Sequence, residues 1–177
     1  MRIIAGQLKG RHFDSPRTNR THPMSDKIRG ALFNALGDLS DLTVLDAFAG
    51  SGALSFEAVS RGAASALAVE LDKDAFRAIS DNIQRLNLQA QVNVLRKNVK
   101  SWSRGNQDKR FDIVLADPPY NDIRPDLLQS LGWQTKPDGL FVVSWPGKVE
   151  PRRFEGVELI DAKTYGDAQL VFYRRTS

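Results

Sequence analysis

The sequence predicts a doubly wound α/β fold, in which helices cover both faces of a mostly parallel sheet. From residue 42 onward, apolar runs of strand length alternate with helical patterns. Because helices separate consecutive strands, the crossovers favour parallel neighbours, and a sheet covered on both faces explains why the strands are apolar nearly throughout. The length of 177 residues and the hydrophobic share of 41% fit one globular domain.

Each strand and helix is assigned from its own run of residues. Apolar runs predict strands at 43–48, 66–69, 92–95, 111–116 and 140–143. Helical spacing predicts helices at 53–61, 73–86 and 124–131. Two later runs, 157–161 and 169–174, have little helix between them, so we expect an antiparallel pair to complete the sheet.

The amino-terminal residues differ from the alternating pattern. Residues 2–13 combine scattered apolar positions with two glycines, which favours a small hairpin, and a loop is expected from there to Pro23. Ser25 can then cap a helix that Gly37 ends. The expected organisation is therefore an arm over residues 1–24, followed by one main domain over residues 25–177.

Positive charge is concentrated in this amino-terminal part of the chain. Residues 1–30 hold seven Lys/Arg against two acidic residues, whereas the whole chain has a net charge of +4. Such a segment is either a solvated terminus or an arm that neutralises phosphates, and charge alone leaves both open. The candidate RNA-contacting residues are Lys9, Arg11, Arg17, Arg20, His22, Lys27 and Arg29.

Composition argues against several kinds of site and location. The chain has no cysteine and two histidines, so disulfides, thiolate nucleophiles and metal sites are not expected. No apolar stretch approaches the roughly 18 to 20 residues of a membrane span, and the amino terminus lacks the apolar run of a secretory signal. We expect a cytoplasmic monomer without membrane or metal partners.

A glycine-rich turn follows the strand predicted at 43–48. Gly50 and Gly52 carry no Cβ, so the backbone can come close to a ligand at the carboxyl end of the strand. The next strand ends at Glu70, where a carboxylate can accept both hydroxyls of a ribose. The turn and Glu70 together predict a site for a cofactor that contains a nucleoside.

The turn departs from the fingerprint of a dinucleotide-binding Rossmann protein. Ser55 replaces the third glycine, and Asp46 precedes the turn, where a carboxylate would repel a pyrophosphate but could accept from an ammonium group. A zwitterionic adenosyl amino acid therefore fits better than NAD, and the alternative is a purely structural turn. The turn and the strand before it resemble the first motif of the class I methyltransferases, which implies S-adenosylmethionine as the cofactor. The candidate cofactor residues are Asp46, Phe48, Gly50, Ser51, Gly52, Glu70, Leu71 and Asn98. For Asn98, contact with adenine and a role as a turn residue both remain open.

The sequence Asp117-Pro118-Pro119-Tyr120 follows the strand predicted at 111–116 and is the most specific signal in the chain. Two prolines fix the backbone and remove two N–H donors, which leaves carbonyls and a carboxylate as a rigid row of acceptors. Such a row can orient the lone pair of an exocyclic amine on a base, and Tyr120 offers a flat face for stacking. These four residues are the candidate catalytic residues, and a turn that ends a strand is the structural alternative.

With these motifs, the chain resembles the RsmD family of small-subunit ribosomal RNA guanine-N2 methyltransferases over nearly its whole length. The amino-terminal stretches that carry the resemblance are residues 6–11 (Gly-x-x-Lys-Gly-Arg) and 25–34 (Ser-Asp-Lys-Ile-Arg-x-Ala-Leu-Phe-Asn). Residues 45–54 follow, with Leu-Asp-x-Phe-Ala-Gly-Ser-Gly-Ala-Leu, and then Glu57 to Ala63 and the Asp-Pro-Pro-Tyr motif. The chain departs from the family pattern at His22 and Met24, and at Ser144, where a glutamate is expected.

The resemblance implies both a fold and an activity. The fold is Rossmann-like and typical of class I methyltransferases, with a mostly parallel seven-stranded sheet, helices on both faces and a small amino-terminal β-hairpin extension that helps to hold RNA. The activity is transfer of a methyl group from S-adenosylmethionine to N2 of one guanine in 16S ribosomal RNA, within the small subunit or its assembly intermediate.

Three other functions remain as alternatives. A DNA or RNA methyltransferase that acts on adenine N6 or cytosine N4 would share the Asp-Pro-Pro-Tyr motif, but this chain is short for a separate target-recognition domain. Methylation of a protein glutamine would normally require asparagine at position 117. A non-catalytic RNA-binding module would use the basic arm but would not need Asp46, Glu70 and Asp117 together.

Overall fold

The structure is a computed structural model that describes residues 1–17 and 23–177. It divides into two compact units, Met1–Val99 and Lys100–Ser177. Each unit holds part of the predicted alternation of strands and helices. In the described part of the chain, no helix combines the length and the apolar character that crossing a membrane requires.

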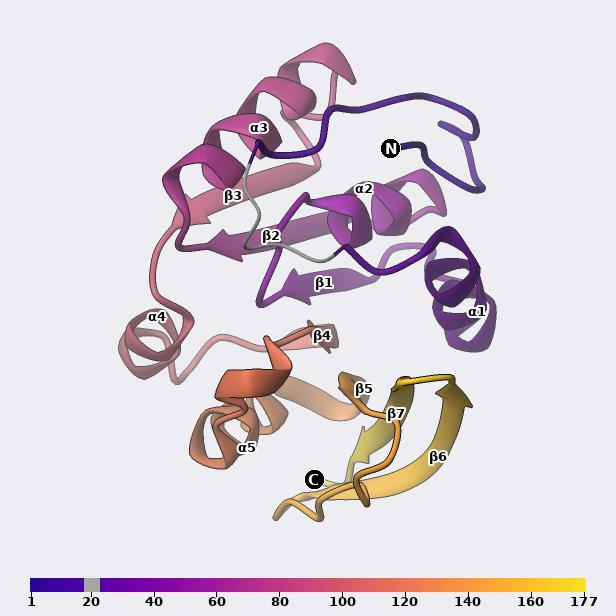
Figure 1. Cartoon of the computed structure of the whole chain (residues 1–177). Coiled ribbons are helices and arrows are strands. Elements are labelled where there is room, and N and C mark those ends of the chain that lie inside the picture. The colour runs from indigo at the N-terminus through magenta and orange to yellow at the C-terminus, as the bar shows by residue number, and fades with distance from the viewer. Residues whose placement is uncertain (18–22) are drawn as a thin grey trace. The chain divides into compact units, whose positions relative to one another are not determined.

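The first unit is a parallel three-stranded arrangement covered by helices (Figure 1). Its elements are α1 (Asp26–Leu36), β1 (Thr43–Asp46), α2 (Ala53–Ser60), β2 (Ser65–Glu70), α3 (Lys73–Arg85) and β3 (Val92–Arg96). The strand order is β3-β2-β1, and both pairings are parallel. The carboxyl ends of these strands therefore lie at one edge, where β1 leads into the glycine turn and β2 ends at Glu70.

The second unit combines one parallel strand pair with an antiparallel hairpin. Its elements are α4 (Val99–Gly105), β4 (Phe111–Ala116), the 3-10 turn η1 (Tyr120–Asp122), α5 (Pro125–Trp133), β5 (Thr135–Pro146), β6 (Val157–Tyr165) and β7 (Ala168–Arg175). The strand order is β4-β5-β7-β6, with β4 and β5 parallel and the other pairings antiparallel. The seven strands confirm the predicted mostly parallel sheet and the antiparallel pair that completes it.

The helix ends follow from local hydrogen bonds. The Ser25 hydroxyl accepts from the Ile28 N–H at 3.2 Å, which caps α1 as predicted, and Gly37 ends that helix at a φ of 76°. The Asp72 carboxylate accepts from two N–H groups in the first turn of α3, each at 2.9 Å. This cap lies two residues after Glu70, so it also fixes the chain beside the end of β2.

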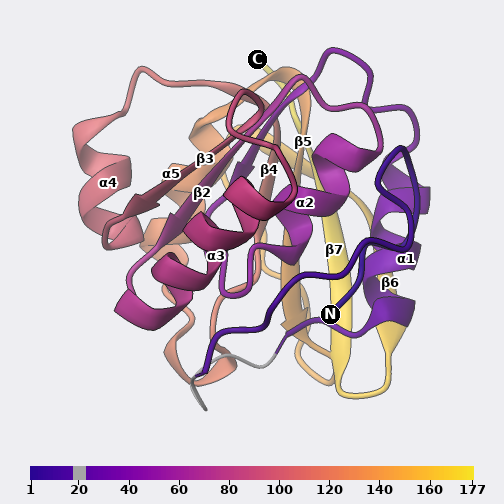
Figure 2. The same ribbon diagram turned by 90° about the horizontal axis from the view of Figure 1, so that it is seen from above.

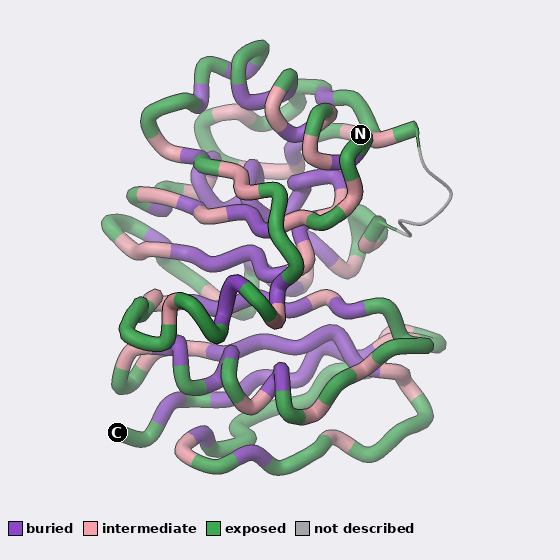
Figure 3. The backbone as a smooth tube through the Cα atoms, turned by 90° about the vertical axis from the view of Figure 1, so that its left-hand side faces the viewer, coloured by how far each residue is buried: buried purple, intermediate pink, exposed green. Residues whose placement is uncertain are grey.

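Burial is greatest along β1, β4 and β7 and in the second half of β5, and Figure 3 shows purple runs of this kind in the sheet. Leu45 and Phe56 are completely buried in the first unit, as are Phe141 and Tyr173 in the second. Strand β6 differs, because nearly all its residues are exposed. Its polar sequence explains why only its beginning was predicted as a strand. Helix α4 was missed because it has seven residues and a weak apolar stripe, in which Val99 and Trp102 are the buried hydrophobic residues.

The amino-terminal arm docks on α2 and α3 within the first unit (Figure 2). An antiparallel bridge joins Arg2 to His12, which places a minimal hairpin in the stretch predicted for one. Ile3 and Phe13 are buried, and the Phe13 ring lies edge-on to Phe56 with 5.1 Å between the ring centroids. Apolar burial therefore anchors both ends of this hairpin.

A buried carboxylate, Glu57 on α2, organises the backbone of the arm. Its two oxygens accept from the Ile4 and Ala5 N–H groups at 2.9 and 3.0 Å, and one also accepts from Arg61 at 2.9 Å. The Arg29 Nε lies 3.8 Å from the same carboxylate, and both side chains are fully buried. Removing one member of such a buried charge network typically costs about 3 to 5 kcal/mol, so the arm and α2 stabilise each other.

Gly6 is the point of closest approach between the arm and α2. A Cβ at this position would lie 1.9 Å from the Ser60 carbonyl oxygen. Gly10 has nearly the same backbone conformation, with φ of 81° against 84°, but a Cβ there would meet nothing within 4 Å. An alanine at position 10 would thus add only the strain of a left-handed backbone, whereas an alanine at position 6 would add the same strain and a steric clash.

We predict that Gly6→Ala undocks the arm, whereas Gly10→Ala leaves it in place. Gly10→Ala should cost about 1 to 2 kcal/mol from backbone strain, and Gly6→Ala should cost more because the clash adds to the same strain. Hydrogen exchange at the Ile4 and Ala5 amides should rise sharply in Gly6→Ala and change little in Gly10→Ala. Equal protection of these amides in the two variants would contradict the docking described above.

Candidate functional site

The glycine turn of the first unit begins where β1 ends. Gly50 and Gly52 have φ values of 54° and 78°, which favour glycine. A Cβ on Gly52 would also lie 3.1 Å from the Phe56 and Ile79 side chains, so this position is restricted in space as well as in conformation. Ser51 is buried between the two glycines, and Phe48 is half-buried just before them. The predicted turn is thus a tightly packed entrance to α2.

Glu70 joins this turn to the end of β2. One carboxylate oxygen accepts from the Gly50 N–H at 2.7 Å, and the other accepts from the Asp72 N–H at 2.7 Å. Burial raises the pKa of Glu70, and the backbone hydrogen bonds oppose this shift. A carboxylate has about four lone-pair sites, so acceptor capacity remains for a hydroxyl at each oxygen. The predicted ribose acceptor and the predicted turn therefore belong to one hydrogen-bonded unit.

Asp46, the last residue of β1, binds the helix that follows the same turn. Its carboxylate is 1% exposed and accepts from the Ser55 hydroxyl at 2.8 Å and from the Ser55 N–H at 3.2 Å. Ser55 occupies the position of the third glycine of a dinucleotide-binding loop, and the Ser55 hydroxyl donates to the Asp46 carboxylate. The structure thus gives Asp46 a part in shaping the turn, while its contact with a cofactor ammonium stays a prediction.

The two remaining candidates for cofactor contact are exposed residues that lie just after strands β2 and β3. Leu71 follows Glu70 directly and is 58% exposed, which is high for a large apolar side chain. Asn98 is exposed and immediately precedes α4. Contact of either residue with adenine stays a prediction.

In the second unit, the Asp-Pro-Pro-Tyr motif lies between β4 and η1. Asp117 follows the last residue of β4, Pro119 is in an extended conformation, and Tyr120 begins the 3-10 turn. Asp117 is half-buried, and burial raises its pKa to about 6, although a hydrogen bond from Ser144 lowers it in part. The carboxylate is therefore mostly ionised at neutral pH, which suits an acceptor of N–H groups.

The Tyr120 side chain of this motif is hydrogen-bonded to Ser144 of β5. The Tyr120 ring is 41% exposed, and its hydroxyl lies 2.8 Å from the Ser144 Oγ. Burial of the hydroxyl is the main cause that raises the pKa of Tyr120. Ser144 was noticed in the sequence as a departure from the family pattern and was not among the predicted site residues. The signal that could have found it is a polar residue within the apolar second half of β5.

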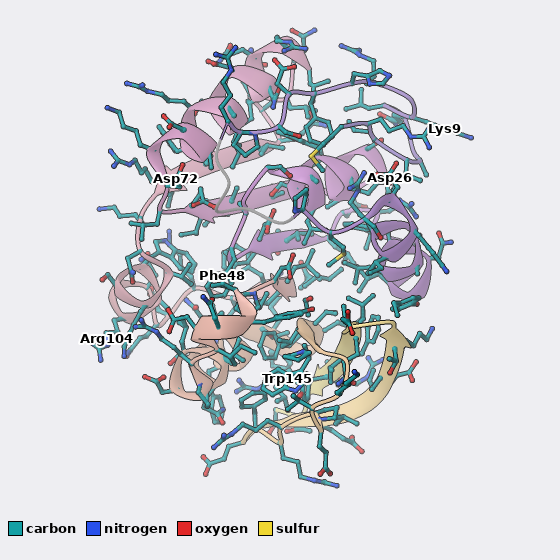
Figure 4. The ribbon with its side chains drawn as sticks, viewed as in Figure 1. Lys9, Asp26, Phe48, Asp72, Arg104 and Trp145 are labelled. Atoms are coloured by element: carbon teal, nitrogen blue, oxygen red, sulfur yellow. The ribbon has the colours of Figure 1, made fainter. Side chains whose placement is uncertain are left out.

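The predicted RNA-contacting residues divide into three groups. Lys9, Arg11, Arg17 and Lys27 are exposed, and Figure 4 shows the Lys9 side chain pointing away from the ribbon. Arg20 and His22 lie outside the described residues. For Arg29 the prediction of an RNA contact is wrong, because its side chain is fully buried.

The buried Arg29 guanidinium has partners within the protein instead. It donates to the Arg2 carbonyl at 2.7 Å and to the Asp26 carboxylate at 3.1 Å. Through these contacts and its position beside Glu57, Arg29 helps to hold the arm on the first unit. A basic residue on α1 can face the core when a buried carboxylate pairs with it. The sequence pattern did not predict this burial, because the carboxylate belongs to another helix.

Known proteins match this chain over most or all of its length. The family model described as Conserved hypothetical protein 95 matches residues 1–174. Ribosomal RNA small subunit methyltransferase D of Haemophilus influenzae is 32% identical over 98% of this chain and 92% of its own length. The protein of the same name from Buchnera aphidicola (Acyrthosiphon pisum) is 38% identical over 67% of this chain, and the match spans 62% of that protein.

Solved structures give the same picture of the fold. The protein yhhF of Escherichia coli has a TM-score of 0.88 at 29% identity, covering 99% of this chain and 98% of its own. HI0767 of Haemophilus influenzae has a TM-score of 0.80 at 29% identity with the same coverage. The predicted Rossmann-like class I methyltransferase fold is confirmed, and the chain belongs to the RsmD family, that of ribosomal RNA small subunit methyltransferase D.

Proposed function

We propose that this protein transfers a methyl group from S-adenosylmethionine to the exocyclic N2 amine of a guanine in small-subunit ribosomal RNA. The observation that carries the proposal is the half-buried, mostly ionised Asp117 beside the exposed Tyr120 ring, in a chain of this family. The relatives' names specify ribosomal RNA of the small subunit. The choice of guanine N2 rests on the family resemblance of the motifs.

The first unit supplies residues that suit the cofactor. When bound, S-adenosylmethionine supplies an electrophilic methyl group on a sulfonium. Gly50 has no side chain to keep a ligand away from the backbone, and Glu70 has acceptor capacity for ribose hydroxyls. Leu71 offers an exposed apolar surface next to this carboxylate, suited to one face of an adenine ring.

The second unit supplies residues that suit an aromatic amine. The lone pair of such an amine is delocalised into the base, so the nitrogen is a weak nucleophile. Acceptors that bind its N–H groups favour tetrahedral geometry and orient the lone pair, and the Asp117 carboxylate and the proline-flanked carbonyls are acceptors of this kind. The nitrogen would gain the methyl group as the methyl–sulfur bond breaks, with the electron pair of that bond staying on sulfur. The nitrogen would also lose one proton, which passes to Asp117 or to solvent.

The basic arm suits the RNA around the target base. Lys9, Arg11, Arg17 and Lys27 are exposed, and the arm that carries most of them is fixed to α2 and α3 by backbone hydrogen bonds. A docked arm presents its charges at defined positions, so phosphate contacts cost less ordering entropy than they would in a free terminus. We infer that the substrate is ribosomal RNA in the small subunit or in its assembly intermediate.

Methylation of adenine N6 or cytosine N4 is the second candidate, because Asp117 and its neighbouring carbonyls would suit those amines equally well. The product distinguishes them. With tritiated S-adenosylmethionine and small subunits that lack the modification, we expect label in N2-methylguanosine after nucleoside digestion. Asp117→Asn should lower kcat/KM by about 100-fold or more, as the loss of a charged acceptor in a transition state does. Label in an adenine or cytosine nucleoside would overturn the guanine proposal.

Charge on the docked arm should set the salt dependence of RNA binding. The double variant Lys9→Gln/Arg17→Gln should lower the slope of log Kobs against log salt by about 1.5, because each phosphate contact contributes roughly 0.7 to 0.9. The matched control, Lys163→Gln/Arg174→Gln, removes the same charge from exposed positions of β6 and β7. Equal slopes for the two double variants would show that net charge, and not the arm, governs binding.

A further inference from the structure

Ser144 lies within β5, one residue past the last registered pair between β4 and β5. The register pairs Ala116 of β4 with Val143 of β5, so the residues that follow this pair are Asp117, just after the end of β4, and Ser144, still within β5. Ser144 is 6% exposed, whereas Tyr120 is 41% exposed. A buried hydroxyl thus lies between a half-buried carboxylate and an exposed ring.

The number of protons on these groups fixes the direction of their hydrogen bonds. The Ser144 hydroxyl has one hydrogen, and it hydrogen-bonds to the Asp117 carboxylate, which can only accept while it is ionised. The contact of 2.8 Å between Ser144 Oγ and the Tyr120 hydroxyl must then use the Tyr120 hydrogen. The chain of donors runs from Tyr120 to Ser144 and on to Asp117.

The charge states of the groups nearby keep the hydrogen bonds running from Tyr120 through Ser144 to Asp117 at neutral pH. Burial raises the pKa of Tyr120, so the phenol stays protonated and remains a donor. The negative charge of Asp117 also contributes to raising the pKa of Tyr120. Asp122 at the end of this turn pairs with Arg124, which precedes α5, at 3.0 Å.

We propose that Ser144 is a positioning residue for methyl transfer, whose hydroxyl ties the Tyr120 ring to the Asp117 carboxylate. The inference rests on the proposed function, since it assumes that a base stacks on the ring while its amine meets the carboxylate. An exposed ring can rotate, and a hydrogen bond from its hydroxyl to a buried partner limits that rotation. Ser144 thereby fixes the stacking surface relative to the acceptor without contact with the base.

The hydroxyl also has a measurable effect on the carboxylate. A hydrogen bond to the ionised form favours that form, so its loss raises the pKa of Asp117. In Ser144→Ala, the pH at which Asp117 titrates should move upward by about 0.5 to 1 unit, the size expected for one hydrogen bond. Activity that needs the ionised carboxylate should then decline at a higher pH than in the wild type.

The experiment compares Ser144→Ala with two related variants and one control. Ser144→Thr keeps a hydroxyl and should restore wild-type behaviour. Tyr120→Phe keeps the ring and leaves Ser144 able to donate to Asp117. Ser103→Ala removes a similarly buried hydroxyl that donates to Gln134 at 2.9 Å in the same unit, so it controls for loss of packing and stability.

Two readouts are needed, the NMR titration of the Asp117 carboxyl carbon in the free protein and the pH profile of kcat/KM. Ser144→Ala should raise the titration midpoint and shift the acidic limb of the profile with it, whereas Ser103→Ala and Ser144→Thr should do neither. At neutral pH, Ser144→Ala and Tyr120→Phe should each lower kcat/KM by about tenfold. The double variant should lose little more, because both changes break one chain of hydrogen bonds.

The outcomes separate this inference from the proposed function. An unmoved midpoint in Ser144→Ala, or additive losses in the double variant, would overturn the role of Ser144. A wild-type protein that methylates another base, or none, would overturn the proposed function. In that case the titration still decides whether the Ser144 hydroxyl binds the Asp117 carboxylate, because it requires no substrate.

Discussion

The structure depends on one constraint, that a carboxylate withdrawn from water must receive hydrogen bonds from its surroundings. Glu57 receives them from the backbone of the arm, Asp46 from the start of α2, Glu70 from the glycine turn and Asp117 from Ser144. Glu57 and Glu70 lie inside or at the end of a regular element and hold a less regular segment, whereas Asp46 and Asp117 are bound by residues of α2 and β5. The rigid scaffold thereby imposes defined positions on the segments that carry the chemistry.

This constraint links stability to function within each unit. The carboxylate that accepts from the Gly50 N–H is the one that suits a ribose, and the carboxylate that accepts from Ser144 is the one that suits an amine. Burial raises the pKa of both, because withdrawing a carboxylate from water disfavours its charged form. Sites of this kind are organised before a ligand arrives, which lowers the ordering entropy that binding must offset.

The sequence predicted the regular elements well because their signals are local. Strand β4 was predicted with its observed ends, and α1 with its Ser25 cap. Apolar periodicity could not reveal β6, whose side chains are mostly exposed, nor the burial of Arg29, which depends on a carboxylate 28 residues further along the chain. The positions of the cofactor and reaction motifs were predictable from strand ends. The partnership of Ser144 with Tyr120 was not, because it depends on the register between β4 and β5.

The most direct test of this account is the affinity of Glu70→Gln for S-adenosylmethionine, measured by calorimetry. The amide keeps the size of the side chain but loses the charge and half of the acceptor capacity, so we expect affinity to fall by about 10 to 100-fold. Asp74→Asn is the matched control, because Asp74 is exposed in the first turn of α3 and caps nothing in the glycine turn. Unchanged affinity in Glu70→Gln, or an equal loss in Asp74→Asn, would contradict a cofactor site organised by this carboxylate.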